Sequence, residues 1–486
     1  RHGGATSTAA PSVQVAVPVL QIAAGLLPIG FCDASLSARL APLAAERWGP
    51  GGGADCWLMA GARLVPPGVA VLLSTACGWL ADGRSRGARG FWSGSRALVG
   101  CGLSAAVVGQ LGVAAAVAHA DSCVPLVAGL ALLSLGRAAL CVGLRCRLAE
   151  AVAPSRLAFS FGLGAAFEIF GGVLGWSAAA FEWGRLGFFP GFVSAACAPG
   201  SACFELRLAM LKSFVLTALA VLLAIQAAPA EERRRRRRIS GPPPSTEAPP
   251  ETPAASKDQG PRAPRGAGCA DAGPVDGALR DAGAQAVFAA SVLAWLAWWS
   301  LEADLERFLT EELVGAAAAC RVLARARVLR AVLSFAAVAW LPVYLRAVGA
   351  FGCWLSCNLA LASLLLLGAA LRAAPGWAGL ALVWLVGFGA VQAVQLSVPY
   401  IVMVRRAQAR AASVAMAVAV ASVPCAVAQA LCLALGALAR ALAGGSAAGP
   451  LCAGATCALW AAQCTSRALA CDRDGCRLPP PAPQAD

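Results

Sequence analysis

Apolar stretches of about membrane length recur along the whole chain, separated by short polar or charged segments. A helix needs about 20 mostly apolar residues to cross the hydrocarbon core of a bilayer. Twelve stretches approach that length, and they predict an all-α polytopic membrane protein. Their approximate ranges are 13–36, 64–81, 97–118, 124–144, 157–181, 208–228, 284–305, 328–344, 349–371, 376–401, 412–437 and 447–468.

A long polar segment divides the predicted spans into two sets of six. Residues 1–228 are predicted to form an N-terminal six-helix half, and residues 284–468 a C-terminal one. Between them, residues 229–283 contain a run of arginines followed by sequence rich in Pro, Ser, Gly and Ala. This composition cannot bury a core, so we expect a disordered cytosolic linker. Residues 469–486 are predicted to be a cytosolic tail.

Composition and charge exclude several other classes of protein. Of 486 residues, 59% are hydrophobic and 13% are charged, which leaves no polar domain large enough for a soluble enzyme with an anchor. The sequence contains no Ser/His/Asp set or phosphate loop, so we expect no enzyme and no cofactor. The sequence has only two histidines, too few for a histidine-based metal site, and we expect no metal.

The distribution of basic residues predicts the topology. With both termini in the cytosol, the inner loops hold about twice as many basic residues as the outer loops, as the positive-inside rule requires. The cluster Arg321–Arg327 is an exception on the outer side. The net charge of +14 therefore indicates topology rather than nucleic-acid binding. The run Arg233–Arg238 either contacts anionic lipid of the inner leaflet or serves topology alone.

A short charged turn, residues 78–89, joins the second and third spans. It reads Gly-Trp-Leu-Ala-Asp-Gly-Arg-Ser-Arg-Gly-Ala-Arg, which resembles the loop between the second and third helices of major facilitator superfamily transporters. That resemblance implies a cytosolic gate whose acid exchanges arginine partners between states; the alternative is a basic loop that only sets topology. The residues assigned to the motif are Gly78, Asp82, Arg84, Arg86 and Arg89.

Several further motifs are similar to those of solute carrier family 45, which is related to the plant sucrose–proton symporters. Residues 169–175 resemble that family's Gly-Gly-x-x-Gly stretch in the fifth span. Residues 295–297 are similar to its Trp-Leu-Ala-Phe, and residues 398–400 stand where it has Leu-Pro-Tyr. The resemblance implies the major facilitator fold and a secondary transporter of small molecules, with a sugar carried together with protons. It also implies alternating access between the two halves.

The chain departs from this family at its usual membrane acids. The acid of the first span falls on Leu36, with Asp33 nearby, and the acid of the fourth span falls near Arg137. Proton coupling needs a titrating group inside the membrane, so two hypotheses stay open. One is a divergent proton-coupled sugar symporter. The other is a transport-inactive, major-facilitator-like membrane protein that acts through partner or lipid contacts.

Polar side chains inside the spans are the candidate substrate or coupling residues, because their burial in a bilayer is costly. For each, a structural role is the competing interpretation: a buried ion pair for Arg137, the outer end of a span for Glu302, and interhelical hydrogen bonds for the glutamines. Trp295 can stack on a sugar or pack between helices. The candidates are Asp33, Arg137, Glu168, Trp295, Glu302, Gln392 and Gln395.

Two cysteines in the outer loop before the sixth span, Cys197 and Cys203, are predicted to form a disulfide or to remain free thiols. The expected location is the plasma membrane or an intracellular vesicle membrane.

Overall fold

The computed structural model describes most of both predicted halves. The described residues are 13–48, 53–81, 94–117, 124–181, 197–198, 200–227, 282–373, 376–410, 412–442, 446 and 448–475. Within them every regular element is helical and no strand is present, which confirms the predicted all-α class. Nine helical segments of this part are long and apolar enough to cross a membrane, and Pro66–Ala81 is a shorter apolar helix.

The N-terminal half contains six membrane spans. Its first span is broken at residues 25–26 into two helices, just before Pro28, which has no backbone N–H to continue the helical ladder. The elements are α1 (Val13–Ala24), α2 (Leu27–Trp48), α3 (Gly53–Ala81), α4 (Ser95–Ala116), α5 (Val124–Glu150), α6 (Leu157–Ala180) and α8 (Ala202–Gln226).

The C-terminal half also contains six long helical segments, although two of them are joined. In the longest helix, Gly349 has a φ of 75°, a left-handed conformation that suits glycine, and there the chain turns between the two predicted spans 328–344 and 349–371. The elements are α11 (Ala282–Glu302), α12 (Leu305–Arg307), η3 (Phe308–Leu313), α13 (Ala316–Leu371), α14 (Ala378–Ala409), α15 (Val414–Leu442) and α16 (Ala448–Gly475).

Most helices are longer than the apolar stretches that predict them. The helix α5 continues to Glu150, beyond the predicted span 124–144, so Arg145 and Arg147 are helical and each only 4% exposed. Likewise α16 extends to Gly475, inside the predicted tail 469–486. Arg145 remains helical here because Glu168 and Tyr400 replace water around its guanidinium. Residues 228–281, which hold nearly all of the predicted linker, lie outside the described residues.

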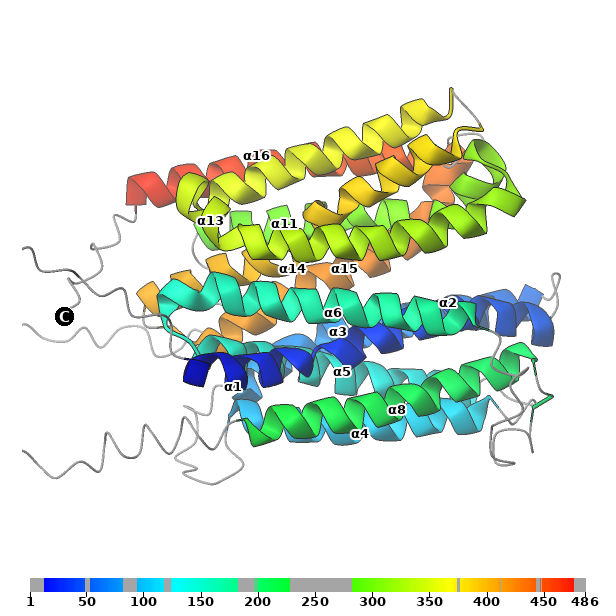
Figure 1. Cartoon of the computed structure of the whole chain (residues 1–486), viewed down its shortest axis with the longest axis horizontal. Helices are drawn as coiled ribbons and strands as arrows, with labels where there is room; N and C mark the ends of the chain where they lie inside the picture. The colour runs from blue at the N-terminus through cyan, green and yellow to red at the C-terminus, as the bar shows by residue number, and fades with distance from the viewer. Residues whose placement is uncertain are drawn as a thin grey trace, which may run out of the picture.

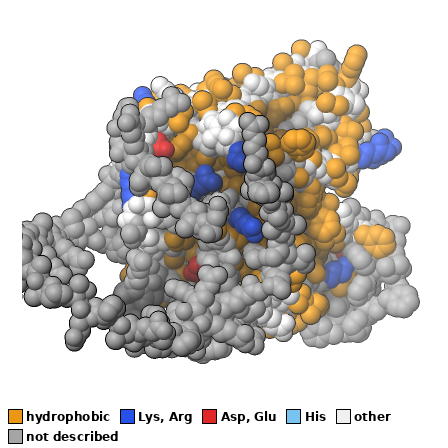
Figure 2. Space-filling view, turned by 60° about the vertical axis from the view of Figure 1, so that its left-hand side comes forward, with side chains coloured by type: hydrophobic (Ala, Val, Ile, Leu, Met, Phe, Trp, Pro, Cys, Tyr) orange, Lys and Arg blue, Asp and Glu red, His pale blue; other side chains and the backbone are white. Residues whose placement is uncertain are grey.

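The two halves lie side by side, with α11 and α13–α16 on one side and α1–α8 on the other (Figure 1). The start of α1 and the end of α16 lie at the same end of the bundle, as an even number of spans requires. Hydrophobic side chains cover much of the described surface in Figure 2, and large ones such as Leu72 and Val383 are 74% and 69% exposed. A surface of this kind faces lipid.

Glycines bring the first and fifth spans into backbone contact. A Cβ at Gly30 would overlap the backbone of Glu168, and one at Gly171 would overlap the backbone of Leu27. Gly175 approaches the carbonyl oxygen of Phe31 in the same way. The Gly-Gly-x-x-Gly stretch therefore holds α6 against α2, as small residues do between membrane helices.

Buried apolar residues form three cores. One lies within the N-terminal half and includes Leu26 and Leu133, and another lies within the C-terminal half and includes Trp384 and Phe388. The third combines both halves, from the predicted cytosolic ends of α3, α5 and α6 to those of α11, α14 and α15. The halves thus share one core near the predicted cytosolic side and have separate cores elsewhere. The predicted disulfide is present: Cys197 and Cys203 are joined, with Cα atoms 5.7 Å apart.

Candidate functional site

An ion pair lies halfway along the helices of the N-terminal half. The guanidinium of Arg137 in α5 donates to the carboxylate of Asp33 in α2. The Asp33 side chain is 44% exposed, although its neighbours Cys32 and Ala34 are 1% and 5% exposed. The carboxylate therefore faces an open space inside the bundle while the helix around it is packed. This pair is compatible with both interpretations of Arg137, a structural ion pair and a coupling residue, since a coupling acid also needs a counter-charge.

A second ion pair lies two helical turns further along α5. Arg145 Nη2 lies 2.6 Å from Glu168 Oε2 in α6, and the two side chains are 5% and 20% exposed. Asp33 and Arg137 both interact electrostatically with Glu168. The two pairs are thus one set of two acids and two arginines. One carboxylate of such a set can bind or release a proton, because the two arginines keep the net charge of the set small in either case.

Arg145 also connects the two halves. Its Nη1 donates to the hydroxyl of Tyr400 in α14 over 2.8 Å, and its guanidinium lies 4.2 Å from the centre of the Tyr400 ring. The Tyr400 hydroxyl in turn donates to Ser422 Oγ in α15 over 3.2 Å. One buried arginine therefore holds an acid of its own half and a phenol of the other half, through a charge-assisted hydrogen bond and a cation–π contact.

Apolar packing closes the bundle on the predicted cytosolic side of Arg145. Phe161 stacks on Tyr400 with ring centres 5.8 Å apart. A Cβ at Gly78 would overlap the side chain of Ala419, so α3 and α15 approach closely at their cytosolic ends. Gly78 of the charged turn therefore has a steric role between the halves. Its other motif residues, Asp82, Arg84, Arg86 and Arg89, lie outside the described residues.

The two candidate glutamines of α14 lie in different surroundings. Gln395 is 1% exposed; its Nε2 donates to Asn358 Oδ1 over 2.9 Å, and its Oε1 accepts from Trp354 Nε1 over 3.4 Å. Asn358 donates to Thr465 over 3.2 Å. This amide network joins α13, α14 and α16 and matches the interhelical alternative. The Oε1 of Gln392 is buried and has no hydrogen-bond partner among the described residues, which leaves it able to accept from a substrate hydroxyl.

The remaining two candidates lie away from Asp33. Trp295 is 8% exposed and packs in the core of the C-terminal half. Glu302 is the last residue of α11, and its Oε1 lies 2.6 Å from Arg330 Nη1 in α13. Trp298 lies beneath the Arg330 guanidinium, 5.3 Å from it. This pair belongs to the outer end of the seventh span, as the competing interpretation of Glu302 expects.

Sequence reasoning missed the roles of Arg145 and Tyr400. Arg145 follows Arg137 by eight residues, which places the two about 80° apart around a helix and could have indicated neighbouring positions on one broad polar face. Its position beyond the apolar stretch instead favoured a loop. Tyr400 entered only as part of a family motif, and no pattern in α14 indicates its partner in α5. Among the described residues, no three His, Cys, Asp or Glu side chains converge as metal ligands would.

No protein-family profile and no curated sequence matches this chain. Its backbone is similar to that of FucP, a major facilitator superfamily transporter in the outward conformation (TM-score 0.62, 14% identity, 94% of this chain and 99% of that one). A bacterial homologue of the iron transporter ferroportin, in an outward-facing state, gives a TM-score of 0.60 at 13% identity over 93% of this chain and 99% of that one.

The proton:xylose symporter XylE, bound to 6-bromo-6-deoxy-D-glucose, gives a TM-score of 0.60 at 13% identity, covering 93% of this chain and 95% of that one. Likeness at such low identity shows the fold, and membership of solute carrier family 45 stays a prediction. The chain is an integral, multi-pass membrane protein with the fold of major facilitator superfamily transporters.

Proposed function

We propose that the protein is a secondary active transporter of a small polar molecule, with alternating access between its two six-helix halves. The observation that supports this most is Arg145, which is buried between the halves and binds Glu168 of one half and Tyr400 of the other. Interior charges are costly in a membrane and usually mark ion or substrate pathways. A buried contact across the two halves is also the contact that has to break when they rock.

The proposed coupling ion is the proton, and Asp33 is its proposed carrier. Its carboxylate is paired with Arg137 yet open to the interior, so it can exchange protons with water there. Protonation would weaken the pairing with Arg137, and the freed guanidinium could then bind a substrate oxygen. Glu168 interacts electrostatically with Asp33 and is paired with Arg145. A change of charge at Asp33 would therefore alter the strength of the Glu168–Arg145 pair.

A sugar is the proposed substrate class. The support is the resemblance to solute carrier family 45, the fucose:proton and xylose:proton symporters among the proteins of similar fold, and the free acceptor on Gln392. Sugar hydroxyls need several hydrogen-bond partners inside a protein. Arginine and amide groups on α5 and α14 would supply them from both halves.

Uptake into proteoliposomes tests this proposal. We expect a pH gradient, acidic outside, to drive accumulation of at least one sugar from a panel of mono- and disaccharides. Asp33→Asn removes the titrating group at constant size, so we expect it to lower gradient-driven accumulation by roughly tenfold while sugar exchange without a gradient persists. Equal accumulation by Asp33→Asn and the unaltered protein would assign the proton to another group.

A transport-inactive membrane protein is the second candidate function. It is favoured by the pairing of each interior acid named here, since Asp33, Glu168 and Glu302 all contact an arginine and could be purely structural. Correctly inserted protein that moves no sugar, and shows no saturable binding of any panel member, would favour this function. In that case the protein would act through contacts with partner proteins or lipids.

A further inference from the structure

The two halves also contact each other toward the predicted non-cytosolic end of the bundle. The guanidinium of Arg327 in α13 lies over the ring of Trp176 in α6, 3.4 Å from its centre. Figure 1 shows the end of α6 and the start of α13 at the end of the bundle opposite to the start of α1. Arg327 belongs to the basic cluster that departs from the positive-inside rule, so topology does not explain its charge.

The interface between α6 and α13 changes in character along its length. A Cβ at Gly162, near the predicted cytosolic end, would lie 3.1 Å from a valine of α13. Further along, Phe170 meets Phe335 edge to face, with ring centres 5.9 Å apart. Of these three contacts only the outermost, between Trp176 and Arg327, includes a charge. Apolar surfaces resist separation into water, whereas a guanidinium that leaves a ring is readily hydrated. The outer contact is therefore the one of the three best suited to open.

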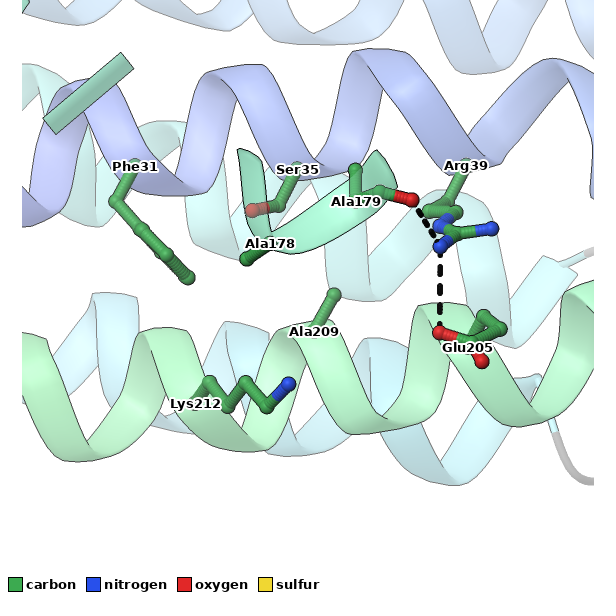
Figure 3. Close-up of a pocket in the computed structure, with 8 residues that line it drawn as sticks. All are labelled: Phe31, Ser35, Arg39, Ala178, Ala179, Glu205, Ala209 and Lys212. Atoms are coloured by element: carbon green, nitrogen blue, oxygen red, sulfur yellow. Dashed lines mark hydrogen bonds and ion pairs between the residues drawn. The ribbon is translucent and has the colours of Figure 1, made fainter. Parts of the chain in front are cut away.

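The outer end of α6 is fixed to its own half (Figure 3). Gly175, next to Trp176, approaches α2 so closely that a Cβ would overlap its backbone. Arg39 of α2 donates to the carbonyl oxygen of Ala179, and its Nη2 lies 3.3 Å from Glu205 Oε2 in α8. Carbonyl groups in the last turn of a helix lack partners within it, so this arginine caps α6. Trp176 is thus held in place relative to α2 and α8.

The arginine of this contact is fixed to the C-terminal half. Arg330, three residues further along α13, pairs with Glu302 of α11 at 2.6 Å. Arg327 interacts electrostatically with Arg330 and with the acids Glu302 and Glu306. Because these acids offset the repulsion between the two arginines, Arg327 can remain beside its neighbour and reach the ring. Each partner of the contact therefore moves with its own half.

This contact has a counterpart toward the predicted cytosolic side. There the guanidinium of Arg145, from the N-terminal half, lies 4.2 Å from the ring centre of Tyr400, from the C-terminal half. Glu168, which pairs with Arg145, precedes Trp176 by about 12 Å along α6, by the rise of an α-helix. The two halves thus exchange arginine–aromatic contacts at two depths, with the roles of the halves reversed. Two states interconvert readily only when neither is far more stable, and paired contacts of one kind favour such a balance.

We propose that Trp176 and Arg327 form the outer gate of the protein, with Arg39 as the residue that positions Trp176. This inference rests on the proposed transporter function and adds the residues that close its non-cytosolic side. When the halves separate at this end, the guanidinium leaves the ring and water takes its place. When the halves close, the contact forms again. The outer gate therefore opposes the contact of Arg145 with Tyr400, which favours closure of the cytosolic side.

Thiol labelling of the full-length protein in intact cells tests the outer gate. Cys141 is partly exposed and its Sγ contacts Arg145 Nη1, so an impermeant maleimide added outside has to pass the outer gate to reach it. Mass spectrometry of the peptides gives the labelling rate at this cysteine. We expect Arg327→Met and Trp176→Leu each to raise that rate by about fivefold or more, which is the effect of losing a partly desolvated cation–π contact.

Matched variants separate the contact from general packing. Arg327→Lys keeps a cation and Trp176→Phe keeps a ring, so we expect each to change the rate less than Arg327→Met does. Arg325→Met removes the same charge from an exposed arginine of the same cluster and should leave the rate unchanged. The double variant Trp176→Leu/Arg327→Met should change the rate no more than either single change, because both remove one contact. Arg327→Lys and Trp176→Phe still test the outer gate if the stronger changes do not fold.

The positioning role of Arg39 is tested in the same assay. Arg39→Met frees the end of α6 but leaves the Trp176 ring, so we expect a smaller rise in the labelling rate. Combined with Arg327→Met it should add nothing, because a positioning residue acts only through the contact. Additive changes would assign Arg39 to the stability of the N-terminal half and remove it from the outer gate.

Three results would overturn the outer gate. They are an unchanged or slower rate in both Arg327→Met and Trp176→Leu, additive changes in their double variant, and equal acceleration by Arg325→Met. Tyr400→Phe should slow the labelling, and a faster rate there would contradict the opposition of the two contacts. Labelling is measured without transport. Acceleration in a protein that moves no sugar would therefore support the outer gate and count against the sugar proposal, whereas sugar transport with unchanged labelling would overturn the outer gate alone.

Discussion

The two six-helix halves stabilise their interiors with different chemistry. In the N-terminal half, Asp33, Arg137, Arg145 and Glu168 place four charges between α2, α5 and α6. At the corresponding depth of the C-terminal half, neutral side chains including Gln395 and Asn358 hydrogen-bond across α13, α14 and α16. The ion pair of that half lies at the outer end of α11.

This difference indicates that the two halves have different roles in the proposed transport cycle. Charged groups respond to protons and to each other over several ångströms, whereas a satisfied amide network changes little during a cycle. In the proposed transport cycle, we therefore assign proton coupling to the N-terminal half and expect the C-terminal half to move against it as a stiff body. Tyr400 is a residue of the C-terminal half that contacts the charged set, through Arg145.

The largest expected effect comes from Glu168→Gln. The change leaves the Arg145 guanidinium buried without its acid, which typically costs about 3–5 kcal/mol when one partner of a buried pair is removed. We expect transport to be lost and the thermal unfolding midpoint in detergent to fall. The matched control is Glu302→Gln, which breaks the ion pair of the other half. An equal loss of transport in that control would end the distinction between the halves.

A smaller effect is expected from Tyr400→Phe. The ring and its stacking on Phe161 remain, but Arg145 loses one charge-assisted hydrogen bond to the other half, worth about 1.5–3 kcal/mol. The proposed cycle breaks this bond when the cytosolic ends open, so we expect its loss to shift the balance of states toward cytosolic opening by roughly tenfold or more. Cysteine accessibility from each side of the membrane measures that balance. Ser422→Ala, which keeps the contact with Arg145, is the control and should shift it less.

Most of the fold was predictable from the sequence, because apolar length alone specifies a membrane helix. The twelve spans and their division into two halves follow from that rule. Helix ends were not predictable from it. The helix α5 extends through Arg145 because Glu168 of α6 and Tyr400 of α14 replace water around its guanidinium. Such partners are far apart in sequence and leave no periodic pattern.

The candidate site was predictable only in its residue types. Acids and arginines inside spans are rare enough to be noticed one by one, and Asp33, Arg137 and Glu168 do come together. Their pairing depends on how α2, α5 and α6 are rotated against one another. Glycine contacts such as that of Gly171 with Leu27 set this rotation. The sequence shows the glycine motif, but it does not show which residues of α2 the glycines contact. Gln392 and Gln395 are equally hard to tell apart from the sequence. They lie three residues apart on one helix, yet Gln392 Oε1 has no hydrogen-bond partner among the described residues and the Gln395 amide is hydrogen-bonded.

The smallest effect on transport is expected from Gln395→Leu. The change leaves the Asn358 Oδ1 and the Trp354 Nε1 without the partners they have now, and each unsatisfied buried group costs about 1–3 kcal/mol. Both groups lie within the C-terminal half, so the cost should fall on stability and leave the exchange between states nearly unchanged. We expect a lower unfolding midpoint in detergent, with sugar uptake per folded molecule close to that of the unaltered protein. Gln392→Leu is the matched control at the neighbouring position: it removes an unpartnered acceptor, so it should preserve stability and instead weaken sugar binding. If Gln395→Leu abolished uptake while the protein stayed folded, the amide network would take part in the cycle, and the C-terminal half would not be the passive body that its neutral interior indicates.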